Sequence, residues 1–111
     1  MIGMDAFGER RYLCSEPVTL RFRGESLVVN LEEIDSAIAV LESEDPLPVG
    51  VAAEMDTGGR RFSGTLVSAQ QTPPLGWRIE FEFSPSTPWS IDRFRPSHLF
   101  DPSTLTETGS A

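Results

Sequence analysis

The chain has 111 residues and a mass of 12.2 kDa, a size typical of a single domain. Hydrophobic residues make up 39% of it and charged residues 23%, which excludes a wholly disordered chain. Nine arginines and no lysine stand against 17 Asp and Glu, so the formal charge is −8, and we expect no nucleic-acid partner because cation-phosphate contacts supply most of that binding energy. A local arginine pocket for a small anionic ligand remains compatible with this charge, since screening confines the field of exposed charges to about 10 Å.

The cysteine and histidine content excludes two kinds of stabilising site. Cys14 is the single cysteine and His98 the single histidine, so neither an internal disulfide nor the usual structural zinc site is expected. The first residues, MIGMDAFGERR, lack the basic and apolar regions of a secretory signal, and no stretch approaches the ~20 apolar residues of a membrane helix. We therefore expect a cytoplasmic protein with no membrane insertion and no metal or cofactor.

The first predicted strand follows a lead-in. Residues 1–16 are expected to be a flexible lead-in, and the barrel or sandwich domain is expected over residues 17–83. Residues 17–23, PVTLRFR, place Val18, Leu20 and Phe22 on one face and polar residues on the other. Such alternation is typical of a half-buried strand.

A second strand and a third run follow. A turn at Gly24 and Glu25 leads into SLVVNLEE at residues 26–33, so the pair predicts a hairpin. The run SAIAVLES at residues 36–43 is rich in β-branched residues and is predicted to be a strand. A helix over residues 31–43 is the alternative, because this stretch also has apolar residues at helical spacing.

The clearest hairpin signal lies in the middle of the chain. Alternating apolar residues flank the pair Gly58 and Gly59, which predicts two antiparallel strands joined by a tight turn. The strictest alternation is GWRIEFEF, which ends at Phe83. The even spacing of six strand candidates predicts a mostly β fold, a small antiparallel barrel or sandwich. Its core is expected to be led by Leu20, Phe22, Val29, Leu66, Trp77, Ile79 and Phe81.

The composition changes after the last predicted strand. Residues 84–102 are expected to dock on the barrel, because Trp89, Ile91 and Phe94 are too apolar for a free linker. A short helix is expected from Pro88 to Arg95, with Thr87 as its cap. Residues 103–111 show no apolar periodicity and are expected to form a mobile tail.

No catalytic constellation is present in the sequence. His98 has no Cys or Ser partner at a recognisable spacing, and solvation explains the positions of the acidic residues. No phosphate-binding glycine loop occurs. We therefore expect no enzymatic activity. Carboxylate-based catalysis is the alternative from a different functional class, and the abundance of acidic residues is its only support.

The informative segment is the lead-in, where Arg10 and Arg11 precede the first strand. Guanidinium groups bind phosphates bidentately and stack on bases, so this pair is a candidate ligand-binding group at the barrel rim. A solvated basic turn is the alternative explanation.

Residues 9–83 resemble the PilZ domain, the bacterial receptor module for cyclic di-GMP. The resemblance rests on ERR, a short lead-in, PVTLRF, VNLEE, PLPVG, a GG hairpin and GWRIEFEF. It implies a six-stranded antiparallel PilZ-like barrel with a short C-terminal helix.

Messenger-binding members of this family carry an RxxxR motif in the lead-in and a DxSxxG motif, with Asn sometimes replacing Asp. Arg10 matches the first arginine, but Cys14 stands at the second arginine position. Asn30 matches the start of the second motif, whereas Glu32 stands where Ser is expected and Asp35 where Gly is expected. The resemblance thus implies Arg10 and Asn30 as ligand-binding candidates, with Arg11 as an adjacent substitute for the missing second arginine.

These departures put carboxylates where a diphosphate should bind, and the missing glycine forfeits close backbone approach. Acidic residues crowd the same region in sequence, namely Glu9, Glu16, Glu32, Glu33 and Asp35. The chain is therefore interpreted as a non-catalytic PilZ-like regulatory or adaptor domain that works with a protein partner, with weak or absent cyclic di-GMP binding. A genuine cyclic di-GMP receptor with a non-standard site is the alternative.

Overall fold

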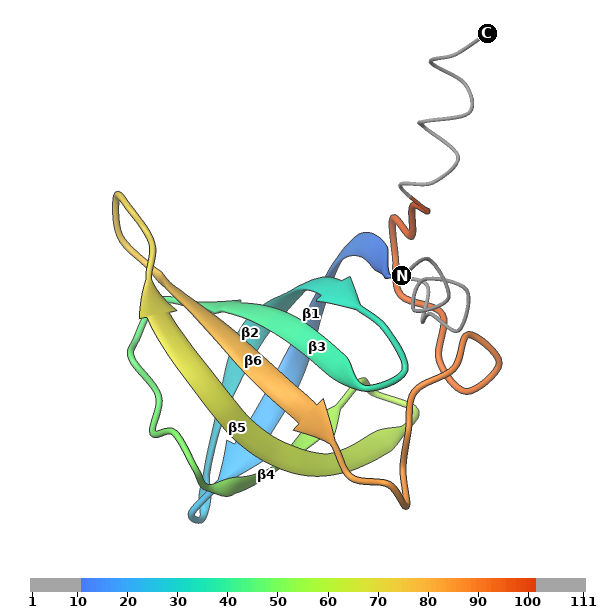
Figure 1. The fold of residues 1–111 in the computed structure, drawn as a ribbon, viewed down its shortest axis with the longest axis horizontal. Helices are drawn as coiled ribbons and strands as arrows, with labels where there is room; N and C mark the ends of the chain where they lie inside the picture. The colour runs from blue at the N-terminus through green and yellow to red at the C-terminus, as the bar shows by residue number, and fades with distance from the viewer. Residues whose placement is uncertain (1–10, 102–111) are drawn as a thin grey trace, which may run out of the picture.

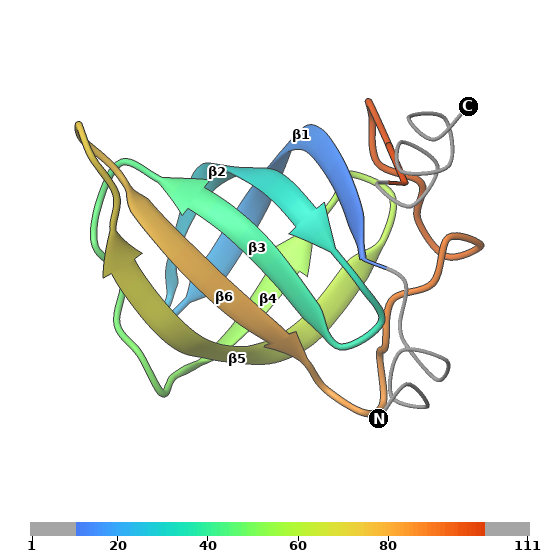
Figure 2. The same ribbon diagram turned by 45° about the horizontal axis from the view of Figure 1, so that its top comes forward.

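The computed structural model describes residues 11–101, which form a closed antiparallel barrel of six strands (Figures 1 and 2). Around the barrel the strands follow the order β1-β2-β3-β6-β5-β4. The predicted mostly β fold and six-stranded antiparallel barrel are confirmed. The strands are β1 (Tyr12–Phe22), β2 (Glu25–Ile34), β3 (Ile38–Ser43), β4 (Ala52–Asp56), β5 (Arg61–Gln71) and β6 (Trp77–Phe83).

β1 begins earlier than expected, at Tyr12 rather than at residue 17. Leu13 lies opposite Glu33 of β2, and on its other side it exchanges two backbone hydrogen bonds of 2.8 and 2.7 Å with Phe100. Both edges of this stretch are thus paired, which holds it in the sheet as part of β1 rather than as a flexible lead-in. Residues 1–10 and 102–111, including the expected tail, lie outside the described residues.

The segment from residue 31 to residue 43 forms two strands and a turn, so the helical alternative is wrong. Asp35 makes this turn. Its Oδ1 accepts hydrogen bonds from the backbone N–H groups of Ala37 and Ile38 at 2.8 and 2.7 Å, and its own N–H donates to Ile38 O at 2.9 Å. Aspartate side chains commonly fold back on the backbone in this way and so compete with helix formation.

A β-bulge in β2 determines which acidic residues face outward. The register with β3 shifts between Leu31 and Glu33, so that Leu31 and Ile34 both point into the barrel and have no exposed surface. Strict alternation from Leu31 would have placed Glu33 in the apolar interior. The bulge instead places the Glu33 carboxylate on the outer face.

The interior is a single apolar cluster. Leu20, Leu66, Ile79 and Phe81 have no exposed surface, as predicted. Val29 and Phe22 are also buried, whereas Trp77 is only half-buried against the cluster. A Cβ at Gly64 of β5 would lie 2.7 Å from the ring of Phe81 and would collide with Glu82 O. Glycine therefore makes room for that ring.

The segment after β6 lies against one end of the barrel, next to the start of β1 (Figure 1). Trp89 is buried in the core cluster, and its ring meets Tyr12 edge-on with 5.7 Å between centroids. The expected helix from Pro88 to Arg95 is absent. Ser90 O instead accepts the N–H groups of Arg93 and Phe94 in a single turn.

The physical reason lies in the residues around this turn. Pro96 disfavours helical backbone at the preceding residue. Trp89 Nε1 donates a hydrogen bond to Phe94 O at 2.8 Å, so this carbonyl binds a side chain instead of a backbone N–H group further along a helix. Within residues 11–101 the structure has no helix with the length and apolar character needed to cross a membrane.

Replacement of Phe81 by Ala is expected to lower the free energy of unfolding by about 3–5 kcal/mol, because a fully buried ring leaves a cavity against Gly64. Urea unfolding followed by tryptophan fluorescence measures this loss. Glu82→Gln on the exposed face of the same strand is the matched control. A loss below about 1 kcal/mol for Phe81→Ala would remove this ring from the core.

Replacement of Trp89 by Ala tests how far the segment after β6 stabilises the barrel. We expect a loss of about 3–5 kcal/mol, because the change removes a buried ring and its contact with Tyr12. Val49→Ala, at a side chain that is 55% exposed, should change stability by less than about 0.5 kcal/mol. Equal melting temperatures for these two variants would show that the segment does not support the barrel.

Candidate ligand-binding site at the start of β1

Arg11 lies just before β1 and reaches the end of β2. Its Nη1 donates to Glu33 Oε1 at 3.1 Å, and its Nη2 donates to Asp35 Oδ2 at 3.0 Å. The two terminal nitrogens of the guanidinium thus hold two different carboxylates. Asp35 uses its other oxygen for the β2–β3 turn, so one side chain both shapes the hairpin and holds the arginine.

The ion-pair network continues across the barrel surface to β6. Glu33 Oε2 lies 3.4 Å from Arg78 Nη1, and Arg78 Nη2 lies 3.9 Å from Glu80 Oε2. Val40 of β3 lies opposite Glu33 on one side and Glu80 on the other, and it is buried although it points away from the core cluster. The charged side chains of its neighbouring strands therefore shield an apolar residue on the outer face.

The electrostatic balance of this network favours ionised groups. Burial alone would lower the pKa of Arg11, but hydrogen bonds and charge from Asp35, and then from Glu33, raise it above its ordinary value. The side chain of Arg11 is 41% exposed, while those of Glu33 and Asp35 are 24% and 11% exposed. Among residues 11–101, three carboxylates and two guanidinium groups compose the network, so these residues carry no excess positive charge for an anionic ligand.

Asn30 has partners of its own. Its Nδ2 donates to Glu32 Oε2 at 2.6 Å and to Ser15 Oγ at 3.3 Å. It lies on β2 between Pro17 of β1 and Glu42 of β3. The structure therefore gives Asn30 and Arg11 separate partners at different positions along β2. Arg10 lies outside the described residues.

Cys14 points into the barrel and belongs to the core cluster, where its thiol lies 3.8 Å from Leu31 O. Burial, and then the charges of Glu32, Glu16 and Glu33, raise the pKa of this thiol from 9.0 to about 12. The position that matches the second motif arginine is thus an interior position in this chain. An arginine there would place a guanidinium among apolar side chains.

Sequence reasoning identified Arg11 but missed Arg78 and treated the acidic residues of β6 as solvated. The alternation of GWRIEFEF did place Arg78 and Glu80 together on the outer face. Their proximity to Glu33 depends on β3 lying between β2 and β6, which the sequence pattern does not specify.

Metal-ligand clusters and similarity to known proteins would each indicate a function. Within residues 11–101, no group of three or more His, Cys, Asp or Glu side chains is arranged to hold a metal ion. Comparisons of the chain with protein-family models, with curated proteins and with solved structures find no match.

The raised pKa of Cys14 predicts a loss of stability in alkaline solution. An unfolded thiol releases its proton near pH 9.0, whereas the folded one holds it until about pH 12. The stabilising contribution is therefore complete below pH 9.0 and is lost as the pH rises through that window. Cys14→Ala removes this dependence.

Urea unfolding of both proteins at about pH 8 and about pH 10.5 should show an extra loss on the order of 1 kcal/mol for the natural sequence at the higher pH. The variant is the reference for every other group that titrates in this range. An identical difference between the two proteins at both pH values would contradict a buried, protonated thiol.

Proposed function

We propose that this chain is a non-catalytic PilZ-like regulatory or adaptor domain of bacterial cyclic di-GMP-related signalling that acts through protein contacts and binds the messenger weakly or not at all. The six-stranded antiparallel barrel supports the proposal at the level of architecture, because the resemblance of residues 9–83 implies such a barrel. The absence of a C-terminal helix in the described residues departs from that resemblance.

The observation that carries the proposal is the occupied guanidinium of Arg11. A phosphate that approached Arg11 would have to displace Glu33 and Asp35, which bind it at 3.1 and 3.0 Å. Displacing Asp35 is further opposed by its role in the turn, since its other oxygen accepts two backbone hydrogen bonds. Both carboxylates would then face the incoming phosphate as like charges.

Isothermal titration of the full chain with cyclic di-GMP tests this proposal. We expect no heat of binding, or weak binding that decreases steeply with salt, because contacts between exposed charges are screened over about 10 Å at 0.1 M ionic strength. Any such weak binding should depend on Arg10 or Arg11, which Arg10→Ala and Arg11→Ala test separately. Tight binding by the natural sequence would overturn the proposal and support the alternative of a receptor with a non-standard site.

A double variant, Glu33→Gln with Asp35→Asn, separates the two explanations of a negative result. Asn at position 35 retains an oxygen for the turn but cannot accept a bond from Arg11 through its amide nitrogen. If the carboxylates mask a messenger site, this variant should bind cyclic di-GMP at least about tenfold more tightly than the natural sequence, a gain of about 1.4 kcal/mol. Glu82→Gln is the control for a simple loss of negative charge.

If the double variant binds cyclic di-GMP no more tightly than the natural sequence, Arg11 does not belong to a messenger site that Glu33 and Asp35 mask. Circular dichroism of each variant confirms that the barrel is folded before the titrations are compared.

A further inference from the structure

An open groove lies on the outer face of β2 and β3, beside the loop that joins β5 and β6. Its open volume is about 420 Å³. Its floor comes from three adjacent strands, since Pro17, Asn30 and Glu42 lie opposite one another in the register. Leu75 of the β5–β6 loop and Glu44 after β3 complete its lining together with Val28, Val29 and Ser43.

The groove carries the two most exposed large apolar side chains of residues 11–101. Leu75 is 86% exposed and Val28 is 69% exposed. Leu13 and Phe100, two others of this kind, are 40% exposed and form a backbone bridge with each other. Scattered single apolar residues need no explanation, whereas these two line the same groove.

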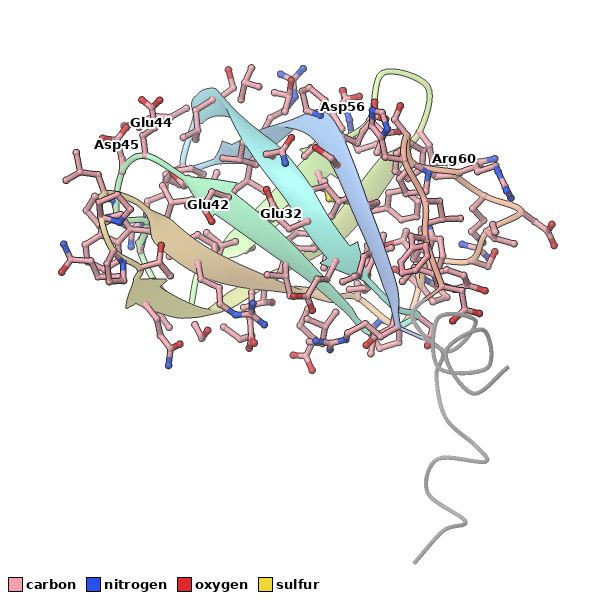
Figure 3. The ribbon with its side chains drawn as sticks, turned by 90° about the horizontal axis from the view of Figure 1, so that it is seen from above. Glu32, Glu42, Glu44, Asp45, Asp56 and Arg60 are labelled. Atoms are coloured by element: carbon pink, nitrogen blue, oxygen red, sulfur yellow. The ribbon has the colours of Figure 1, made fainter. Side chains whose placement is uncertain are left out.

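The carboxylates of the groove are less closely paired than those around Arg11, although Arg78 lies opposite Glu42 in the register of β3 and β6. In the part of the chain that the structure describes, no arginine forms an ion pair with Glu42 or Glu44. In contrast, Glu33 on the same side of the barrel binds both Arg11 and Arg78. Figure 3 shows Glu32, Glu42 and Glu44 over the β2–β3 side, away from Arg60 at the other end.

The backbone around these carboxylates is ordered by local contacts. Ser43 Oγ donates to Asp45 O at 2.8 Å and accepts the Asp45 N–H at 3.1 Å, which holds the turn that carries Glu44. A Cβ at Gly76 would lie 2.5 Å from Glu42 Oε2, so glycine makes room for this carboxylate beside the hairpin loop.

We propose that this groove binds an extended segment of a partner protein in which arginine or lysine alternates with apolar residues. The inference rests on the proposed adaptor function and specifies the chemistry of its partner. Alternate side chains of an extended chain point to opposite sides, so one set can contact Val28 and Leu75 while the basic set reaches Glu42 and Glu44. Unpaired carboxylates repel nucleic acids and anionic membranes, and they match a basic partner.

β2 pairs with β3 only from Asn30 to Ile34, so the first half of β2 has no strand partner on the side of the groove. Backbone hydrogen bonds from an extended segment to this edge would add to its side-chain contacts. The apolar contacts and the charge pairs supply the specificity for side chains, and each set is expected to be necessary.

A synthetic peptide of alternating arginine and leucine, about eight residues long and roughly 26 Å when extended, is a suitable probe. Fluorescence polarisation of the labelled peptide with the full chain measures its binding. One comparison peptide replaces the leucines by glycine, and another replaces the arginines by glutamate. We expect the arginine-leucine peptide to bind at least about tenfold more tightly than either comparison peptide.

Two pairs of substitutions remove the two kinds of contact. Val28→Ser with Leu75→Ser removes the apolar contacts, and Glu42→Gln with Glu44→Gln removes the charges; each pair should weaken peptide binding about tenfold or more. Val49→Ser and Glu82→Gln are matched controls outside the groove and should leave binding unchanged. Every substituted side chain is exposed, so we expect all of these variants to fold.

Amide chemical shifts of the ¹⁵N-labelled chain locate the peptide. Shifts that concentrate at Val28, Glu42, Glu44 and Leu75 support the proposal. Equal binding of the arginine-glycine peptide, with shifts spread over the acidic surface, would overturn it, because the contact would then be charge alone. Binding unaffected by both double variants would also overturn it.

The outcome is separable from that of the messenger titration. The network of Arg11, Glu33, Asp35, Arg78 and Glu80 shares no residue with the groove. Tight cyclic di-GMP binding would overturn the proposed function while leaving the peptide result to be judged by the groove variants. Failure of the peptide to bind would overturn the groove assignment while leaving the masked arginine site in place.

Discussion

Closure of the barrel at β1 is the constraint on which the rest of the structure depends. β1 pairs with β2 along almost its whole length, but it pairs with β4 only from Thr19 to Arg21. The free edge of its first half is covered by the segment after β6, through Leu13 with Phe100 and Ser15 with Ser97. An unpaired strand edge would attract other chains, so this segment completes the sheet as well as the core.

The same closure determines the state of the candidate site. Because Leu13 is held between β2 and the C-terminal segment, the preceding Arg11 lies beside the end of β2 rather than in a free lead-in. There it meets Glu33, which the bulge directs outward, and Asp35, which makes the turn. Two local features of backbone geometry thus place two carboxylates on one guanidinium. Arg11, a candidate ligand-binding residue from the sequence, instead joins the start of β1 to the β2–β3 hairpin.

Features that depend on the pattern within one strand could be predicted from the sequence, whereas features that depend on contacts between distant segments could not. Alternation along single strands predicts the barrel and most of its core, because burial of one face acts on each strand separately. The start of β1 and the turn at Ser90 depend on contacts with residues far along the chain, and local pattern does not contain them. Arg11 was identifiable as a candidate. Its neutralisation was not, because it requires the bulge after Leu31 and the strand order that brings Arg78 beside Glu33.

The distribution of charge, rather than its total, distinguishes the network around Arg11 from the groove that contains Glu42 and Glu44. A formal charge of −8 describes the whole chain, but its carboxylates differ in what opposes them. Glu33 and Asp35 are balanced by arginines and have little electrostatic reason to bind a further group. Within the described residues Glu42 and Glu44 form no ion pair, although Arg78 lies opposite Glu42 in the register, and both lie beside exposed apolar side chains. A partner with cationic and apolar groups would pair with these carboxylates and bury these apolar side chains, whereas an anionic nucleotide would do neither.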